Sequence, residues 1–256
     1  MRLKFLGTGT SQGVPPIGCT DPVCLSEDPK DRRLRTSALI TTEENKKILI
    51  DCGPDFRQQM LSNNESRVDA VLITHEHNDH VIGLDDMRPI IFRNHQDMPL
   101  YCKARTGHEI KKRFPYAFAD DKYPGAPAFE MHLINNSESF DLFDVQVTPV
   151  EVQHAKIDIF GYKFKNLAYL TDVKNISEIE KEKLKNLDFL IISCLRREKK
   201  HLAHLILPEV LELIKELQPT QTYLTHMSHH MGFHKELCKE LPASIQPAYD
   251  GLEIEF

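Results

Sequence analysis

Several features common in other protein classes are missing from this sequence of 256 residues. Its longest apolar stretches, such as Val71–Ile73, have the length of a strand and fall far short of the ~18 apolar residues of a membrane span. Its first residues lack the apolar segment of a secretory signal. Lys and Arg number 32 against 38 for Asp and Glu, so the net charge is −6. We therefore predict a cytoplasmic protein with no membrane span, for which nucleic acid is a poor partner.

Cysteine and linker-type sequence are also scarce. Six cysteines in a chain of this length are too few for a disulfide-stapled fold, so metal binding or burial is expected for them. No Gly/Ser-rich or Pro-rich tract divides the chain. Residues 1–256 are therefore expected to form one domain, and 41% hydrophobic residues are enough for a sizeable core.

Short β-rich runs alternate with helix-like stretches along the chain, which predicts an α/β fold. Strands are expected at Leu3–Leu6, Ser37–Thr41, Lys47–Ile50, Ala70–Thr74, Val145–Val152, Phe160–Phe164, Ala168–Thr171, Phe189–Ile192, Thr222–Thr225 and Leu252–Phe256. Helices are expected at Pro54–Leu61, Leu84–Phe92, Glu109–Phe118, Ser177–Leu184, Pro208–Leu217 and His234–Leu241.

Histidine, in contrast, is abundant, with 13 residues. The predicted strand Ala70–Thr74 runs directly into a motif with four metal-binding side chains, His75, His77, Asp79 and His80. Two histidines spaced two residues apart at a strand end can point to the same side, and the next turn brings the other two side chains close. Imidazole and carboxylate together suit a borderline metal such as zinc. The motif therefore predicts a metal site, and its x-Asp-His ending distinguishes it from a merely His-rich turn.

Three more candidate ligands follow predicted strands. His154 lies just beyond Val145–Val152, Asp172 follows Ala168–Thr171, and His226 follows Thr222–Thr225. Each alone has an ordinary alternative, a surface histidine or a helix N-cap. Loops at strand ends converge on one edge of a sheet, however, so the repeated pattern indicates a single site.

The motif His75-x-His77-x-Asp79-His80, followed in order by His154, Asp172 and His226, resembles the metallo-β-lactamase superfamily over essentially the whole chain. The resemblance implies an α/β fold of the four-layer αββα type. It implies one metal ion on His75, His77 and His154, a second on Asp79, His80 and His226, and Asp172 as the bridge between them. A β-lactamase proper would have Cys in place of Asp172, whereas the carboxylate fits the branches that hydrolyse phosphodiesters and thioesters.

Within that superfamily the chain most resembles the phosphoribosyl cyclic phosphodiesterases of the phosphonate-degradation (carbon-phosphorus lyase) pathway. The similar segments are Phe5–Pro15, the pair Cys19 and Cys24, and Thr225–His229. In that family three Cys and a His hold a structural zinc. The resemblance places Cys19, Asp21, Cys24 and His229 at those positions, with Asp21 replacing the middle Cys. Because a soft sulfur is lost, we expect this third site to be weakened or empty.

Further side chains are candidates for contacts with a substrate. The resembling family has a His that reaches over the site from the loop after the strand Phe189–Ile192, and His204 fits that pattern best. An imidazole there suits the protonation of a leaving alkoxide, whereas His201 and His204 facing solvent is the alternative. Arg88 and Arg196 are candidate phosphate clamps, because a guanidinium matches two phosphate oxygens, although surface ion pairs explain them nearly as well.

These observations predict a phosphodiesterase with two divalent metal ions, zinc or manganese, that hydrolyses a small cyclic phosphate ester. A hydroxide bridging the ions would attack phosphorus, with Asp79 and His204 as catalytic residues. One alternative is RNase Z, the tRNA 3′-end endonuclease, which usually carries a long basic arm where this chain has only the 17 residues 155–171. Another is a non-enzymatic metal-binding protein of the same fold. The sequence leaves open the substrate, the metal and whether the chain forms a homodimer.

Overall fold

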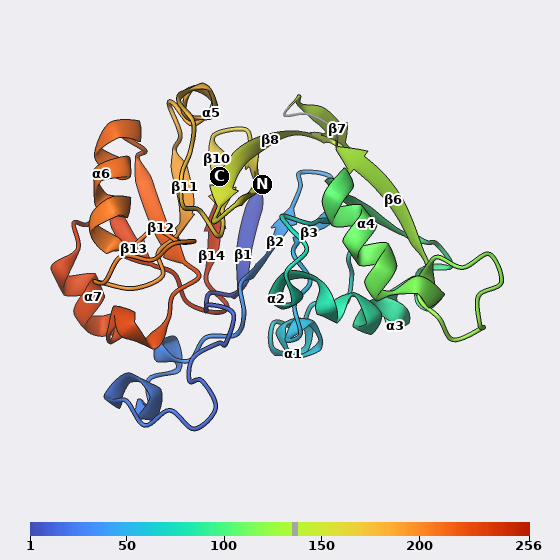
Figure 1. Ribbon diagram of the computed structural model, residues 1–256, viewed down its shortest axis with the longest axis horizontal. Helices are drawn as coiled ribbons and strands as arrows, with labels where there is room; N and C mark the ends of the chain where they lie inside the picture. Colours follow the sequence, from blue (N-terminus) through green and yellow to red (C-terminus); the bar gives the residue numbers. More distant parts are fainter. Residues whose placement is uncertain (135–137) are drawn as a thin grey trace.

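Two mixed β-sheets make up the centre of the computed structural model, which describes residues 1–134 and 138–256 (Figure 1). The first sheet has the order β14-β1-β2-β3-β4-β5-β6, with strands Glu253–Glu255, Arg2–Gly7, Ser37–Thr41, Lys47–Ile50, Ala70–Leu72, Met98–Lys103 and Phe129–Ile134. The second has the order β13-β12-β11-β10-β9-β8-β7, with strands Ile245–Pro247, Gln221–Thr225, Phe189–Ser193, Leu167–Leu170, Ile157–Phe164, Val145–His154 and Phe140–Leu142.

The two sheets repeat one pairing scheme. In the first, β14, β1, β2 and β3 pair antiparallel and β3 to β6 pair parallel. In the second, β7 to β10 pair antiparallel and β10 to β13 pair parallel. Parallel neighbours end at the same edge of a sheet, so the loops after them gather there.

Three apolar layers separate the sheets from each other and from the helices. The middle layer joins residues of both sheets, including Phe5 and Ile50 from the first and Tyr162 and Ile191 from the second. The helices α1, α3 and α4 cover the outer face of the first sheet, and α5, α6 and α7 cover that of the second (Figure 1). These are Phe56–Ser62, Arg88–Asn94, Ala104–Arg113, Glu178–Lys183, Leu207–Leu217 and His234–Glu240. The order helix, sheet, sheet, helix is the expected four-layer α/β sandwich.

The predicted elements were right in type, but several strands were missed. The structure adds β5, β6, β7 and β13, of which β7 and β13 have only three residues each. The expected helix Leu84–Phe92 is a 3-10 turn, Ile82–Met87, followed by α3. The expected helix Glu109–Phe118 begins earlier, as α4, and ends at Arg113, because Pro115 supplies no amide hydrogen to continue it. Within the described residues, no helix is both long and apolar enough to cross a membrane.

Candidate metal centre

The histidine motif lies just past the end of strand β4 of the first sheet. Strand β4 is buried along its length, and after two more residues the chain reaches His75. The amide of Ile73 still donates to Tyr101 of the neighbouring strand β5, which holds the segment against the sheet. His77 then precedes a short helix, α2 (Asn78–Val81), whose first turn carries Asp79 and His80. The rings of His75 and His80 lie 4.2 Å apart between centroids.

The second sheet contributes the other three predicted ligands. His154 is the last residue of β8, and Asp172 and His226 lie just past the ends of β10 and β12. Asp172 and His226 have φ of 55° and 53°, a left-handed backbone that non-glycine residues adopt uncommonly. Such conformations concentrate at functional sites, where the surrounding fold holds them in place. Both side chains are buried.

The carboxylate of Asp172 lies between two groups of histidines. Its Oδ2 is 3.8 Å from Nε2 of His75 and 3.8 Å from Nε2 of His154. Its Oδ1 is 3.2 Å from Nε2 of His226 and 3.5 Å from Nε2 of His80. Two sets of ligand atoms result, each with all its members within 4.8 Å of one another. The first is His75, His77, His154 and Asp172, and the second is Asp79, His80 and His226.

Divalent metal ions fit these residues. Nε2 of His75, Nε2 of His80 and both ring nitrogens of His226 are buried and have no hydrogen-bond partner among the described residues. A buried polar atom without a partner costs free energy, and metal ions bound at the two sets would satisfy the three Nε2 atoms. Imidazole nitrogens and carboxylate oxygens are also the donors that zinc and manganese accept.

The charges of the cluster depend on one another. Burial opposes protonation of His80, but the carboxylates of Asp172, Asp79 and Asp51 outweigh it and hold the pKa of His80 well above its usual value. Burial and the neighbouring charge of His80 keep the pKa of His75 well below its usual value. Burial would raise the pKa of Asp172, but His226 and His80 outweigh this effect and lower it strongly. Protons and metal ions therefore compete for the same buried nitrogens.

Sequence reasoning missed Asp51, which orients His80. Asp51 is fully buried just past β3, and its Oδ2 lies 2.6 Å from Nδ1 of His80. Its carboxylate also accepts hydrogen bonds from the amide and the hydroxyl of Thr74, both at 2.8 Å. A carboxylate on Nδ1 leaves Nε2 of the same ring free to bind a metal ion. The signal was present in the sequence, because Asp51 directly follows the predicted strand Lys47–Ile50 just as Asp172 follows its own.

Comparison with known proteins agrees with this arrangement. A family model described as a β-lactamase superfamily domain matches residues 46–227. A crystal structure of a new diphosphatase from the PhnP family has 41% sequence identity and a TM-score of 0.92, and it covers 100% of this chain and 97% of that one. The chain belongs to the metallo-β-lactamase superfamily, and within it to the PhnP family.

Two curated relatives extend the comparison. An octanoyltransferase of Porphyromonas gingivalis is 42% identical over 253 residues, which cover 99% of this chain and 51% of that protein. A ribonuclease Z of Natronomonas pharaonis is 29% identical over 158 residues, 60% of this chain and 44% of the relative. The chain thus spans about half the length of the curated relatives it matches. The family and the His/Asp cluster together support a metal-binding hydrolase.

The predicted catalytic His204 lies beside the cluster of this PhnP-family chain. Its ring centroid is 4.8 Å from that of His154 and 5.0 Å from that of His226, and its Nδ1 is 4.0 Å from Oδ2 of Asp172. Nδ1 of His154 lies 2.9 Å from the carbonyl oxygen of Ala203, which ties the loop to a predicted ligand. Burial is the main reason that the pKa of His204 falls to about 3, so the free protein holds this ring neutral at pH 7.

The two predicted arginine clamps have partners elsewhere. Arg88 pairs with Asp85 at 2.5 Å and lines a groove with Phe56 and Met60. Arg196 donates to the carbonyl oxygens of Lys199 and Lys200 at 2.8 and 3.2 Å. Within the described residues neither guanidinium forms a hydrogen bond or ion pair with a predicted ligand. Their role as phosphate clamps stays a prediction.

The predicted structural-zinc residues form two overlapping groups. Ligand atoms of Cys19, Cys24 and His229 lie within 4.8 Å of one another, and so do those of Asp21, His229 and His230. Nε2 of His229 is 3.1 Å from Oδ2 of Asp21, while its Nδ1 is buried without a hydrogen-bond partner. Burial and the thiol of Cys19 raise the pKa of Cys24 to about 12. His230 was not predicted. In the second group it offers one more nitrogen that could bind a metal ion.

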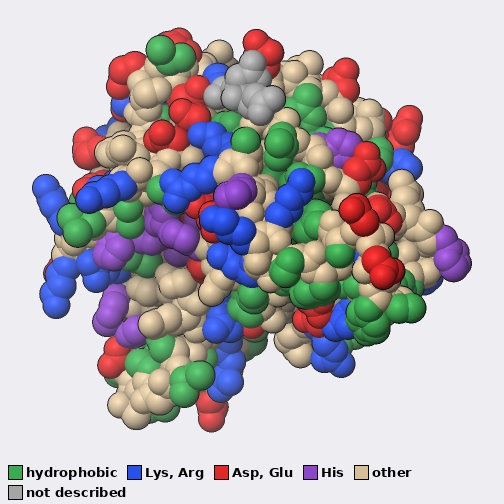
Figure 2. Space-filling view, turned by 45° about the vertical axis from the view of Figure 1, so that its right-hand side comes forward, with side chains coloured by type: hydrophobic (Ala, Val, Ile, Leu, Met, Phe, Trp, Pro, Cys, Tyr) green, Lys and Arg blue, Asp and Glu red, His purple; other side chains and the backbone are tan. Residues whose placement is uncertain are grey.

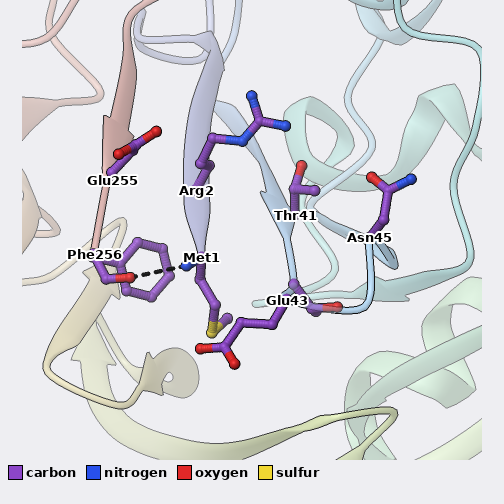
Figure 3. Close-up of a pocket in the computed structure, with 8 residues that line it drawn as sticks. Met1, Arg2, Thr41, Glu43, Asn45, Glu255 and Phe256 are labelled. Carbon is purple, nitrogen blue, oxygen red and sulfur yellow. Dashed lines mark hydrogen bonds between the residues drawn. The ribbon is translucent and has the colours of Figure 1, made fainter.

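A cavity of about 670 Å³ lies away from all of these residues (Figure 3). It is lined by both ends of the described chain, where the Met1 amino group donates to the carbonyl oxygen of Phe256 at 3.1 Å. It contains none of the predicted ligands and no histidine or cysteine. The candidate site is therefore the His/Asp cluster.

Proposed function

We propose that the protein is a binuclear metal-dependent phosphodiesterase that hydrolyses a small cyclic phosphate ester. The observation that supports this most is the position of Asp172, whose two oxygens face two separate sets of histidines. A carboxylate in that position suits two ions held side by side, and two-metal sites are typical of phosphate-ester hydrolysis. The seven ligands, with zinc or manganese bound, would act within one hydrolase domain, residues 1–256.

The predicted ligands divide between two metal ions. His75, His77 and His154 would hold the first ion, and His80, His226 and Asp79 the second. When bound, two divalent ions supply a water of lowered pKa and neutralise charge on the phosphate. Asp79 counts among the catalytic residues because its carboxylate lies within the second set, 3.3 Å from Nε2 of His80.

His204 would act as the general acid. Its ring lies over the ligands His154 and His226, next to the place where a phosphate would bind. In the free protein the ring is neutral at pH 7, since its pKa is about 3. A bound phosphate would bring negative charge against the ring and favour its protonation, so that the proton is available for the departing alkoxide.

A small substrate suits the surroundings of the cluster better than tRNA does. Between His154 and Asp172 the chain forms only β9, β10 and their connections, with no room for a basic arm. The net charge of −6 also disfavours a polyanion. The PhnP-family relative is named as a diphosphatase, which adds substrates with two phosphates to the candidates. The relative named octanoyltransferase is about twice as long as this chain, and the match covers only 51% of it. Its name does not show which half carries the activity, and an octanoyl thioester is therefore included as a comparison substrate.

The cysteine group would be a weak third zinc site. Cys19, Cys24 and His229 offer two sulfurs and one nitrogen, and Asp21 a harder oxygen 3.1 Å from Nε2 of His229. Four donors that do not converge on one point bind zinc less tightly than a closed tetrahedron.

A panel on one metal-loaded sample tests the proposal. It comprises cyclic phosphates, linear phosphodiesters, a diphosphate diester, precursor tRNA and an octanoyl thioester, each with and without chelator. We expect hydrolysis of the phosphodiesters, fastest for the cyclic ones, and loss of that activity with chelator. Faster cleavage of precursor tRNA than of any small ester would favour ribonuclease Z activity. Chelator-insensitive turnover, or none at all, would refute the proposal.

A further inference from the structure

Thr171 directly precedes Asp172, the carboxylate that faces both ligand sets. It follows strand β10 and is fully buried, with 0% of its surface exposed. Its hydroxyl donates a hydrogen bond of 2.7 Å to Oδ1 of Asp172. That contact is shorter than the 3.2–3.8 Å that separate the two carboxylate oxygens from the nearest nitrogens of the predicted histidine ligands. The carboxylate is therefore oriented by a side chain that is not itself a predicted ligand.

The burial of Thr171 keeps its hydroxyl away from solvent. Histidine side chains reach the surface among Lys and Arg side chains on the face shown in Figure 2, whereas Thr171 lies beneath the surface. A β-branched side chain is restricted about χ1, so this hydroxyl keeps one direction. Thr171 is therefore a candidate for positioning the group that accepts its hydrogen bond, and not for contact with a substrate.

The backbone next to Asp172 is held as well. The amide of Val173 donates a hydrogen bond of 3.0 Å to Oγ of Ser193, the last residue of β11. The carbonyl oxygen of Val173 accepts a hydrogen bond of 2.8 Å from the amide of Leu205, which follows His204. Both contacts support the left-handed backbone of Asp172. The freedom left to Asp172 is therefore the rotation of its side chain.

Rotation about the Cβ–Cγ bond of Asp172 decides where its two oxygens lie. This torsion is broad and roughly two-fold in aspartate, so the bond alone does not fix the carboxylate. In the structure Oδ1 lies toward His226 and His80, and Oδ2 lies toward His75. Rotation would take Oδ1 away from His226 and His80. The hydrogen bond from Thr171 opposes that rotation.

We infer that Thr171 is a positioning residue for the second metal ion, because its hydroxyl holds Oδ1 of Asp172 toward His80 and His226. The inference rests on the two ions of the proposed function, and it adds a residue outside both ligand sets. Removal of a partner that orients a metal ligand typically costs 10–100-fold in metal affinity. With an ion on the first set, Oδ2 stays held and Oδ1 is free to turn away. The loss should therefore fall mainly on the second ion.

A titration of metal-free protein with manganese tests this inference. Free Mn²⁺ gives a sharp electron paramagnetic resonance signal, so the loss of that signal measures bound metal, and thiols such as Cys19 and Cys24 bind Mn²⁺ poorly. Thr171→Val keeps the shape of the side chain but lacks the hydroxyl. We expect its dissociation constant for the second ion to rise about tenfold, with little change for the first ion. Thr171→Ser keeps a hydroxyl and should bind both ions as the wild type does.

Thr222→Val is the matched control. Thr222 is 1% exposed and lies in β12, the strand that ends just before His226. Its hydroxyl has no hydrogen-bond partner among the described residues, so the same substitution there should leave both dissociation constants unchanged. Thermal unfolding of the metal-free proteins shows whether each variant is folded. Thr171→Ala removes the same hydroxyl and replaces Thr171→Val in the comparison if the valine variant does not fold.

Metal binding and turnover are measured separately, which distinguishes the two proposals. If no ester of the panel is hydrolysed but Thr171→Val weakens the second ion and Thr171→Ser does not, the phosphodiesterase fails and the positioning role stands. If phosphodiesters are hydrolysed and Thr171→Val binds both ions like the wild type, the positioning role is refuted and the phosphodiesterase stands. Equal weakening of both ions, or no recovery in Thr171→Ser, would also refute the positioning role. Fewer than two ions of either metal bound by the wild type would overturn both proposals.

Discussion

Replacing Asp51 with Asn should disable His80 as a metal ligand while barely changing the shape of the site. In the wild type, Oδ2 of Asp51 lies 2.6 Å from Nδ1 of His80. A carboxylate only accepts hydrogen bonds, so Nδ1 keeps its proton, and Nε2, which faces Asp172 and Asp79, is the atom that gives up its proton when a metal ion binds. In Asp51→Asn the oxygen should stay with the amide of Thr74, which puts the new NH₂ group against Nδ1. The ring then keeps its proton on Nε2 rather than on Nδ1.

The expected effect follows from that tautomer. A ring with its proton on Nε2 must move that proton to Nδ1, and so lose the hydrogen bond from the new amide group, before Nε2 can bind a metal ion. Loss of a partner that orients a ligand typically costs 10–100-fold in metal affinity. This range corresponds to about 1.4–2.7 kcal/mol of binding free energy. The second ion should be affected, because His80 belongs to that ligand set, and the first ion much less.

The assay is a competition titration of metal-free protein with zinc against a chromogenic chelator. Asp250→Asn is the matched control, since Asp250 is a half-buried carboxylate that accepts from the amide of Leu34 and the hydroxyl of Thr8, and among the described residues it forms no hydrogen bond or ion pair with a predicted ligand. Thermal unfolding of the metal-free variants shows whether each is folded. Equal affinity of Asp51→Asn and wild type for both ions, with both proteins folded, would refute the reasoning.

Three further predictions concern the other predicted residues. Asp172→Ala removes the carboxylate that faces both ligand sets, so metal content should fall below that of the wild type. Turnover should fall by at least ~10³, a larger loss than removal of one electrostatic donor causes. Full activity with both ions bound would contradict this prediction. His204→Ala should leave metal content intact and lower the rate by ~10²–10⁴, least for esters with good leaving groups, and an equal loss for good and poor leaving groups would exclude the acid role. The double variant Cys19→Ser, Cys24→Ser should fold and lose little thermal stability, because the three apolar layers of the sandwich do not include residues of that loop. A lower folded yield together with the loss of one bound zinc would show a true structural site.

The sequence predicted which side chains gather in one cluster, because the candidate ligands lie just past predicted strands. His75, Asp172 and His226 each lie just past a predicted strand, and the loops after parallel strands converge at one edge. Two of the missed strands, β6 and β7, have little pattern of their own. Strand β7 is three residues long and β6 alternates poorly, so their pairing partners define them more than their own residues do.

Contacts between distant segments could not be predicted. The pairing of Asp51 with His80 spans 29 positions, and that of Glu76 with Arg105 joins a strand end to the start of a helix. Periodicity reports which face of an element is buried, but not which element lies opposite. Arg88 is a different case, because its partner Asp85 lies only three residues away, in the 3-10 turn before α3.

The most direct test of the two-metal claim is a titration of metal-free protein with zinc or manganese, in which bound metal and hydrolysis of bis(4-nitrophenyl) phosphate are followed on the same sample. If Asp172 joins two ions, activity should stay low through the first equivalent and reach its plateau as the second binds at the His/Asp cluster. The Cys19→Ser, Cys24→Ser variant should give the same curve, which excludes the cysteine group as the source of the second equivalent. Full activity at one equivalent, or no activity with both ions bound, would contradict the account.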